Sequence, residues 1–324
     1  MSTTETNVDE ASAKSSITTA RAASARADAV DALQKKERRR RRLPLLPALI
    51  FTIVVTQVPF LFSLYYSLTE WNLLDNKPRE FTGFDNFTGL FSKQGFTDAV
   101  VASVTMTVSA VLLSIVVGTG LAVLLDRKFF GQGFVRTLLI TPFLVMPVVA
   151  ALVWEEQMLS ESFGLVNWLL ETIGFERIPF VTNYGLWSII LVLVWQWSPF
   201  MMLIVLAGLQ GQDSSVLEAA RVDGATSRGI FFQITLPHLR PYIELSILLG
   251  AIYLIQVFDH VEVMSGGRPG DQNVRHFVYQ RSIGLAFEFG EASAYSVIVV
   301  IATIILATMG LRVLSNLFEG EDPA

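Results

Sequence analysis

Long apolar runs dominate the hydropathy pattern of this chain, and short polar stretches separate them. A helix that crosses a bilayer needs ~20 mainly apolar residues. Six runs reach that length, at about residues 44–68, 99–125, 136–156, 185–209, 242–263 and 292–314. The third run is the least uniformly apolar of the six, because Glu155 and Glu156 lie at its end. The pattern predicts an all-α, polytopic integral membrane protein with six transmembrane helices.

Composition agrees with this fold class. Of the 324 residues, 52% are hydrophobic and only 16% are charged, and the mean hydropathy is +0.50, which is the balance of a membrane protein. The net charge of −5 says little about partners. The chain has no cysteine, which excludes a disulfide framework, a thiol nucleophile and a cysteine-ligated metal.

Residues 1–42 are expected to form a disordered cytoplasmic tail that ends in a basic anchor. Residues 1–34 are rich in Ala, Ser and Thr, a composition typical of disorder, and their five acidic residues argue against a transit peptide. A cluster of lysines and arginines at 35–42 then abuts the first apolar run. Such a cluster can bind nucleic acid, but its place beside a span favours a membrane anchor that attracts anionic lipid, with no nucleic-acid partner.

The positive residues predict which side of the membrane each loop occupies. With the N-terminus inside, and with the distal tail residues Lys14, Arg21 and Arg26 left out, fourteen of them lie on the inner side: Lys35, Lys36, Arg38, Arg39, Arg40, Arg41, Arg42, Arg127, Lys128, Arg136, Arg221, Arg228, Arg240 and Arg312. Seven lie on the outer side: Lys77, Arg79, Lys93, Arg177, Arg268, Arg275 and Arg281. This bias places both termini and the loop of residues 210–241 in the cytoplasm.

The loop of residues 210–241 carries helix signals. Ser215 and Glu218 have the spacing of a capping box, which predicts that a short helix begins there. Gly224 can adopt the left-handed conformation that ends such a helix.

A second short helix is predicted after the glycine. Thr226 or Ser227 can cap its start, and Pro237 is expected to end it. The two helices would form a knob, apolar on one side (Val222, Ala225, Phe231 and Ile234) and charged on the other (Arg221, Asp223 and Arg228). A rigid knob at the water boundary indicates docking with a soluble partner. The alternative is an amphipathic helix at the headgroup level.

The same stretch resembles the cytoplasmic EAA loop of ABC importer permeases, in particular those of the sugar and polyol class that includes the maltose importer. The matching residues are Glu218, Ala219, Ala220, Asp223, Gly224, Ala225, Phe231, Ile234, Leu236, Pro237 and Pro241. In that family the loop is a coupling helix that sits in a groove of a separate ATPase subunit. The resemblance assigns this coupling role to Glu218, Ala219, Ala220, Asp223, Gly224, Ala225, Phe231 and Pro237.

The resemblance extends over roughly residues 44–315 and defines three regions: a tail at 1–42, a six-span permease domain at 43–315 and a cytoplasmic tail at 316–324. Three outer segments fit it, namely an aromatic lid at 81–91, a surface helix at 163–174 and a turn cluster at 265–271. The last departs from the family pattern, because Arg268 separates Gly267 from Pro269.

The fourth apolar run offers a candidate cargo face. Leu193, Gln196, Trp197 and Phe200 share one helix face, and Pro199 frees a backbone carbonyl nearby. Aromatic rings stack on the C–H surface of a sugar and an amide binds its hydroxyls. The alternative is that the rings face lipid or another helix. Positions matching these four line the sugar site in the maltose-type permease.

The third and fifth runs add further candidates. Two prolines, Pro142 and Pro147, predict a broken third span beside a cavity. The resemblance adds Phe143 and Pro147 as sugar-contacting positions, although Pro147 lacks the hydroxyl expected there.

The fifth run offers Tyr253, Gln256 and Asp259. A carboxylate near a span is a functional candidate, although Asp259 can also lie at the outer interface. Leu254 and Val257 replace amide side chains of the maltose permease, which argues against maltose itself and for a polyol or small sugar.

The sequence shows no motif typical of a catalytic, phosphate-binding or metal-binding site. The chain lacks a phosphate-binding G-x-x-x-x-G-K-[ST] motif, and its three histidines, His238, His260 and His276, are too scattered for a metal site. We therefore expect no catalytic residues, no metal and no cofactor in this chain, with ATP and Mg²⁺ bound by a partner ATPase.

The resulting hypothesis is the permease subunit of an ATP-driven importer of a sugar or sugar alcohol in a prokaryotic plasma or inner membrane. The resemblance implies a second permease subunit, two ATPase subunits and an extracytoplasmic solute-binding protein. An ion-coupled secondary transporter is the main alternative, but it needs ionisable residues deep in the spans. A membrane-embedded enzyme lacks a catalytic constellation.

Overall fold

The computed structural model describes residues 44–75, 77–90, 95–284 and 286–319. The tail predicted for residues 1–42 lies outside the described residues, as do residues 320–324 of the predicted C-terminal tail. The chain divides into two compact units, residues 1–62 and 63–324. The described part of the first unit is the beginning of one apolar helix, α2 (Leu45–Ser67), which contains Pro59.

The number of candidate spans agrees with the sequence pattern. In the described part of the chain, four helices are long and apolar enough to cross a membrane: α2, α4 (Phe96–Leu125), α9 (Gly185–Gln210) and α15 (Phe289–Glu319). Two bent pairs raise the number to six if each pair is one span. The first joins α5 (Gln132–Leu144) to α6 (Pro147–Leu152) and η2 (Val153–Met158) at 97°. The second joins the helix that ends at Leu254 to α13 (Asp259–Ser265) at 56°.

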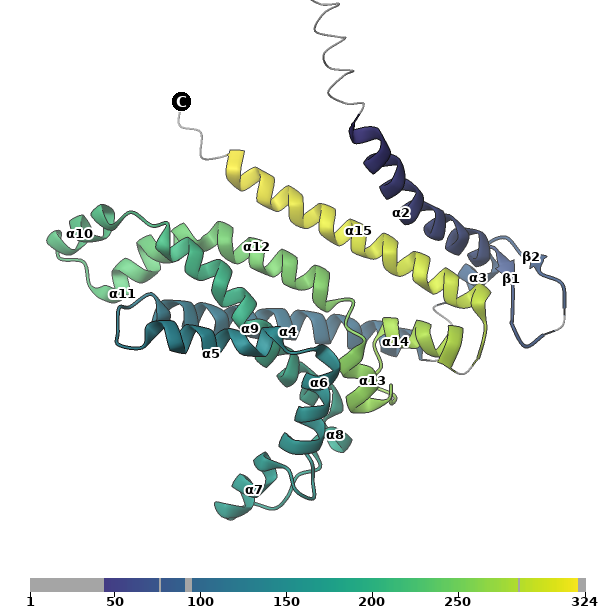
Figure 1. Ribbon diagram of the computed structural model, residues 1–324, viewed down its shortest axis with the longest axis horizontal. Coiled ribbons are helices and arrows are strands. Elements are labelled where there is room, and N and C mark those ends of the chain that lie inside the picture. Colours follow the sequence, from purple (N-terminus) through teal and green to yellow (C-terminus); the bar gives the residue numbers. More distant parts are fainter. Residues whose placement is uncertain (1–43, 76, 91–94, 285, 320–324) are drawn as a thin grey trace, which may run out of the picture. The chain divides into compact units, whose positions relative to one another are not determined.

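The core of the second unit is the packing of α4 against α9, with α12 (Leu236–Leu254) against both and α5 against α9 (Figure 1). Small residues allow the helices to approach closely, as is usual in membranes. A Cβ added at Gly118 of α4 would lie 2.8 Å from both the Met201 Cβ and the Ser198 carbonyl oxygen of α9. No side chain larger than hydrogen fits there without moving a helix.

The opposite face of α4 is apolar and uncovered in this unit. Val101, Val104, Val108, Leu112 and Val116 recur at helical spacing, and each is at least half exposed. An apolar stripe with this exposure is expected for a helix that faces lipid hydrocarbon or a partner helix.

Short elements connect the long helices. β1 (Thr69–Glu70) pairs antiparallel with β2 (Glu80–Phe81), and α3 (Asp85–Thr88) follows within the predicted aromatic lid. The helix predicted at 163–174 is present as α7 (Leu165–Thr172). The turn cluster at 265–271 is confirmed, because Gly266, Gly267 and Gly270 all have positive φ. The remaining elements are α8 (Phe180–Asn183), α14 (Val274–Tyr279) and η4 (Gln280–Gly284).

The loop of residues 210–241 folds as two helices, as predicted, but with a different start. The first helix, α10 (Ser214–Val222), is capped by Asp213, whose Oδ1 accepts from the Ser215 amide at 2.9 Å. The capping box of Ser215 and Glu218 was therefore wrong. Asp213 stands two residues earlier and its carboxylate is a stronger acceptor for the free amides of the first turn.

Pro237 does not end the second helix, which is a further correction. α11 (Ser227–Ile230) continues through a π-helical turn, η3 (Phe231–Thr235), into α12. A proline lacks an N–H and clashes with the carbonyl four residues earlier. A wide π-helical turn directly before Pro237 accommodates that ring without breaking the helix. The cap of this helix is Thr226, whose Oγ1 accepts from the Gly229 amide at 3.2 Å.

Candidate functional site

Two helix breaks face one cavity in the middle of the second unit. The first break lies between α5 and α6, at Val145 and Met146, as the two prolines predicted. The second lies between α12 and α13, at residues 255–258. The cavity has a volume of about 210 Å³ and is lined by Phe143, Val145, Pro147, Gln196, Trp197, Tyr253, Gln256, Val257, Phe258, Asp259 and His260. Irregular backbone at membrane depth is typical of a transport pathway, because it is tolerated only inside protein or beside a cavity.

The first break is closed by Gln196 of α9. Its Nε2 donates to the Val145 backbone oxygen at 2.8 Å, and its Oε1 lies 2.8 Å from the His260 Nε2. The Gln196 side chain is only 4% exposed, so both contacts are shielded from water. One residue thus links α9 to the break in one span and to α13 beyond the break in another. One N–H and one lone pair of the amide remain for a ligand.

The second break is closed from α14. Asn273 Nδ2 donates to the Val257 carbonyl, and Arg275 donates to the Gln256 carbonyl. Asn273 also caps α14, because its Oδ1 accepts from the His276 amide at 2.9 Å. The carbonyls freed at this break are therefore satisfied by side chains rather than left bare in the membrane.

Aromatic rings form one wall of the cavity. The Phe143 ring lies 5.6 Å from the Trp197 ring and 5.3 Å from the Phe200 ring. Trp197 also lies 5.5 Å from Tyr253, so rings from three different spans meet. Rings grouped in this way offer flat apolar faces next to polar groups.

The sequence named nine residues for cargo binding, and the structure gathers most of them. Seven line the cavity: Phe143, Pro147, Gln196, Trp197, Tyr253, Gln256 and Asp259. Phe200 lies behind the wall and stacks on Phe143. Leu193 is fully buried in an apolar core formed by residues of α4, α6, α9, α12 and α13, and it does not line the cavity.

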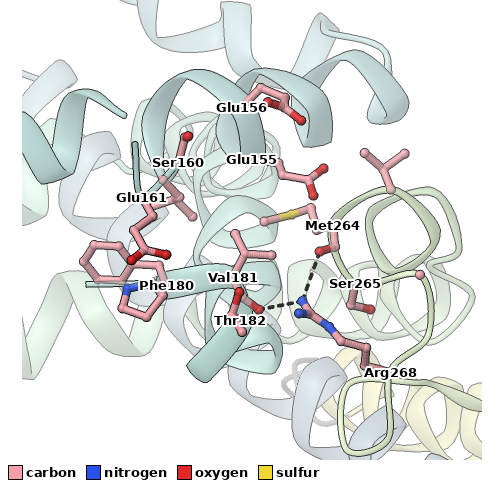
Figure 2. Close-up of a pocket in the computed structure, with 14 residues that line it drawn as sticks. Glu155, Glu156, Ser160, Glu161, Phe180, Val181, Thr182, Met264, Ser265 and Arg268 are labelled. Carbon is pink, nitrogen blue, oxygen red and sulfur yellow. Dashed lines mark hydrogen bonds between the residues drawn. The ribbon is translucent and has the colours of Figure 1, made fainter. Parts of the chain in front are cut away.

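A larger cavity of about 450 Å³ lies between η2, α8 and α13 (Figure 2). Glu155, Glu156 and Glu161 face into it together with Arg268, whose guanidinium donates to the Val181 backbone oxygen at 2.6 Å and to the Met264 backbone oxygen at 3.4 Å. The sequence assigned no function to these residues, and none of the nine cargo candidates lines this cavity.

The loop that follows α13 is fixed to the start of α9. The Asp271 Oδ1 accepts from the Leu186 amide at 2.8 Å, and Gly185 leaves room for this carboxylate, since a Cβ there would lie 2.0 Å from Oδ2. Burial raises the pKa of the Asp271 carboxyl, and the hydrogen bond from Leu186 and the charge of Arg268 offset only part of that rise.

At the other end of α9 and α12, the knob formed by α10 and α11 projects from the helices (Figure 1). No residue of α10 is buried, and Val222 is 87% exposed. Gly224 has φ +84°, and it ends α10 with two bonds, from its own amide to the Arg221 oxygen at 3.1 Å and from the Ala225 amide to the Ala220 oxygen at 2.9 Å. These bonds form a Schellman motif, which confirms the predicted glycine stop.

Most residues assigned to coupling lie on the exposed surface of this knob. Glu218 and Ala219 lie on α10, and Asp223, Gly224 and Ala225 form the turn after it. Ala220 and Phe231 are half-buried, and Pro237 is exposed at the start of α12. Hydrogen bonding by the Ser215 backbone amide lowers the pKa of the capping Asp213.

Each of the three histidines has a protein group as a hydrogen-bond partner. The His238 Nε2 lies 3.2 Å from the Gly208 oxygen, and the His276 Nε2 lies 2.6 Å from the Glu262 Oε2. His260 binds Gln196 as described above. In the described part of the chain, no group of three or more His, Cys, Asp or Glu side chains could hold a metal ion.

Some contributors to the site had no assignment from the sequence. The contact between Gln196 and His260 joins residues 64 positions apart, and no local pattern announces it. Asn273 could have been found, because an asparagine before a short apolar helix is a capping signal. Arg275 was counted only as a charge on an outer loop.

Residues 129–317 match the family described as "Binding-protein-dependent transport system inner membrane component". This match covers more than half of the chain. The chain belongs to this family. It is an ABC importer permease, a multi-pass protein of the inner membrane, and ATP hydrolysis lies on a partner subunit.

Similar proteins agree. A probable ABC transporter permease of Sinorhizobium fredii, y4oQ, is 36% identical over 79% of this chain and 83% of its own length. The sulfoquinovosyl glycerol transport permease SmoG of Agrobacterium fabrum is 32% identical over 83% of this chain and 88% of its own. The trehalose/maltose permease MalF of Thermococcus litoralis is 29% identical over 82% of this chain and 88% of its own.

Solved structures show the same fold. A chain of a bacterial alginate ABC transporter, in complex with an alginate pentasaccharide-bound periplasmic protein, has a TM-score of 0.73 to this protein. It covers 85% of this chain and 94% of its own length at 21% identity.

Proposed function

We propose that this permease imports a small carbohydrate, a sugar or a sugar alcohol, through the cavity between its two broken spans. The observation that carries the proposal is the wall of Phe143, Trp197 and Tyr253 beside polar groups at a helix break. Aromatic faces stack on the C–H surface of a sugar ring, and neighbouring amide and carboxylate groups bind its hydroxyls. The sugar-related names of SmoG and MalF support this cargo class.

The volume of the cavity bears on the size of the cargo. At about 210 Å³ it is smaller than the ~300–1,000 Å³ typical of sites for drug-sized ligands. A cavity of this size accepts one sugar ring or polyol at a time.

Coupling to ATP is proposed to occur through the knob. Two separate ATPase subunits would each hold a coupling helix in a groove, one from this chain and one from a second permease subunit. The exposed α10, with its rigid glycine stop, has the shape of an element that docks. A solute-binding protein would deliver cargo at the opposite end. The alginate transporter complex, which includes a pentasaccharide-bound periplasmic protein, supports such a partner.

We further propose that both termini are cytoplasmic. The excess of positive residues on the side of the knob supports this orientation. It places the knob within reach of a cytoplasmic ATPase and the larger cavity, which Arg268 lines, on the outer side.

A decisive experiment combines cargo identification with energetics. Thermal-shift screening of the partner solute-binding protein against sugars and polyols would identify the cargo. Uptake of that cargo by proteoliposomes holding the assembled complex should require ATP inside the vesicles and resist an uncoupler. Uptake that ignores ATP and collapses with the uncoupler would instead support the secondary-transporter alternative, and a binding protein that prefers amino acids would remove the carbohydrate proposal.

A further inference from the structure

One carboxylate stands in the cargo cavity without a protein partner. Asp259 is the first residue of α13 and lines the cavity. Among the described residues that line it, Asp259 supplies the only carboxylate, and there is no lysine or arginine. An ionisable side chain in a membrane span is costly to keep, and it therefore marks a function by default.

The other acidic side chains of this region are engaged. Glu262, one turn further along α13, binds the buried His276 at 2.6 Å. Asp271 accepts from the Leu186 amide, and Glu288 pairs with Arg281 at 2.9 Å. Within the described part of the chain, the Asp259 carboxylate takes part in no ion pair and no hydrogen bond.

Two arginines of this region are directed elsewhere. Arg275 donates to the Gln256 carbonyl and lines a separate apolar groove along α15. Arg268 binds the Val181 and Met264 carbonyls in the larger cavity. Neither lies within 4.0 Å of the Asp259 carboxylate as an ion-pair partner. The cargo cavity thus carries a negative charge that nothing beside it neutralises.

We propose that Asp259 selects cargo by charge, so that neutral and basic carbohydrates enter this cavity and acidic ones are rejected. This inference rests on the proposed function and narrows its substrate class. A carboxylate accepts hydrogen bonds from several hydroxyls, and bonds to an ionised acceptor are stronger than neutral ones. A carboxylate, sulfonate or phosphate on the cargo would meet a like charge in a partly dehydrated site, and such repulsion is an effective way to reject a competitor.

The aromatic wall also favours neutral or basic cargo over acidic cargo. Trp197, Phe143 and Tyr253 line the same cavity as Asp259. The face of an aromatic ring carries partial negative charge, so it attracts cations and not anions. An amino sugar would satisfy both the rings and the carboxylate.

The absence of cysteine allows a direct test of the charge in the cavity. Gln256→Cys places one thiol at an exposed, cavity-lining position in the break between α12 and α13, three residues before Asp259. The assembled complex is treated with positively and negatively charged methanethiosulfonate reagents of similar size, and labelling of this chain is followed with time. Each rate is divided by the rate for a small free thiol.

The ratio of positive to negative rates should exceed one and fall by about tenfold when Asp259→Asn is added, because one unit charge at this range changes the preference by that order. Asp259→Glu, which keeps the charge, should preserve the ratio. Glu262→Gln removes an equal charge outside the cavity lining and is the matched control that should change little. The positive charge of Arg275 is present in every variant, so it affects all the labelling ratios equally. A ratio that Asp259→Asn leaves unchanged overturns the proposal.

A second measurement uses the cargo itself. Uptake of the identified carbohydrate is competed with its own amino and carboxylate derivatives. The acidic derivative should compete at least about tenfold more weakly in the wild type, and Asp259→Asn should remove that difference. Equal competition by the acidic derivative in the wild type would overturn charge selection while leaving carbohydrate import intact, whereas the absence of any carbohydrate uptake would count against the proposed function instead.

Discussion

The side-chain amide of Gln196 donates to the backbone oxygen of Val145 across 2.8 Å and closes the gap in the broken third span. The same amide holds His260 at 2.8 Å on the far side of the break in the fifth span. The two walls of the cavity are thereby joined by one residue of a helix that is itself unbroken. Gln196 positions the cavity wall in addition to any contact that it makes with cargo.

The first prediction follows from this contact. Gln196→Leu should lower the free energy of unfolding by about 1–3 kcal/mol for each buried polar group that it leaves without a partner, here the Val145 oxygen and the His260 ring. Thermal unfolding of the purified complex measures it. Ser198→Ala is the matched control, because Ser198 is equally buried on α9 but bonds only its own helix, at the Val194 oxygen. Equal losses in the two variants would show that the link is not structural.

The second prediction concerns the aromatic wall. Trp197→Ala should abolish or strongly retune uptake of the cargo while assembly with the partner subunits persists, because the ring is proposed to stack on the cargo. Transport assays and co-purification measure the two properties. Trp187→Ala is the control, since Trp187 lies on the same helix with its side chain 57% exposed and outside the cavity lining. Normal uptake in Trp197→Ala would place the cargo site elsewhere.

Much of this fold could be predicted from the sequence, because each membrane span corresponds to a long apolar run. The run at 99–125 is α4, Phe96–Leu125, and the run at 185–209 is α9, Gly185–Gln210. The break in the third span was predicted from Pro142 and Pro147, since two prolines remove two helix bonds. Apolar runs and prolines act on the backbone around them, so they predict local structure without knowledge of the tertiary fold.

The errors lie where neighbours compete or where distant residues meet. Asp213 and Ser215 are both suitable N-cap residues and lie two positions apart, and it is Asp213 that caps α10. Pro237 was tolerated because a π-helical turn precedes it, which no composition rule announces. Leu193 shares a helix face with Gln196, yet it is fully buried in an apolar core to which several helices contribute, and only their packing decides that.

The third prediction concerns topology. Reporter fusions after residue 94 and after residue 272 should report the outer side, and a fusion after residue 212 should report the cytoplasm, because the positive residues cluster on the side of the knob. Paired enzymatic and fluorescent reporters, which are active on opposite sides, provide the control within each fusion. An outer location at 212 would remove the coupling proposal.

The fourth prediction concerns pH. Burial raises the pKa of Asp271 in the folded protein, so the folded state binds this proton more tightly than the unfolded state does. The contribution to stability is present below the unfolded pKa of about 3.9 and is lost as pH rises through the higher folded value. The melting temperature of the wild type minus that of Asp271→Asn should therefore decrease as pH rises from about 4.

Asp75→Asn is the control for this pH series, because its side chain is 57% exposed and its partner Lys77 lies 4.0 Å away in solvent. Its profile should run parallel to that of the wild type. A difference between wild type and Asp271→Asn that does not vary with pH would contradict the assignment of this shift to the Asp271 carboxyl.

The last prediction concerns the knob, whose capping geometry separates stability from docking. Glu218 takes no part in the cap of α10, which Asp213 supplies, and it lies exposed on the helix surface. Gly224 has φ +84° with open space around its Cα, so a side chain there meets backbone strain but no steric neighbour. A non-glycine residue in this conformation costs roughly 1–2 kcal/mol, which is confined to one exposed turn.

Glu218→Lys should therefore leave thermal stability unchanged, and Gly224→Asp should lower it only locally, while both abolish ATP-driven uptake and weaken co-purification with the ATPase. The reason is that both residues present the surface proposed to enter the ATPase groove, where a reversed charge or an added side chain disrupts the fit. Glu171→Lys, an exposed charge reversal on α7 near the other end, is the control and should retain ATPase association. If uptake and association stay at wild-type levels in both knob variants, α10 is not the docking element, and the coupling proposal loses its physical basis.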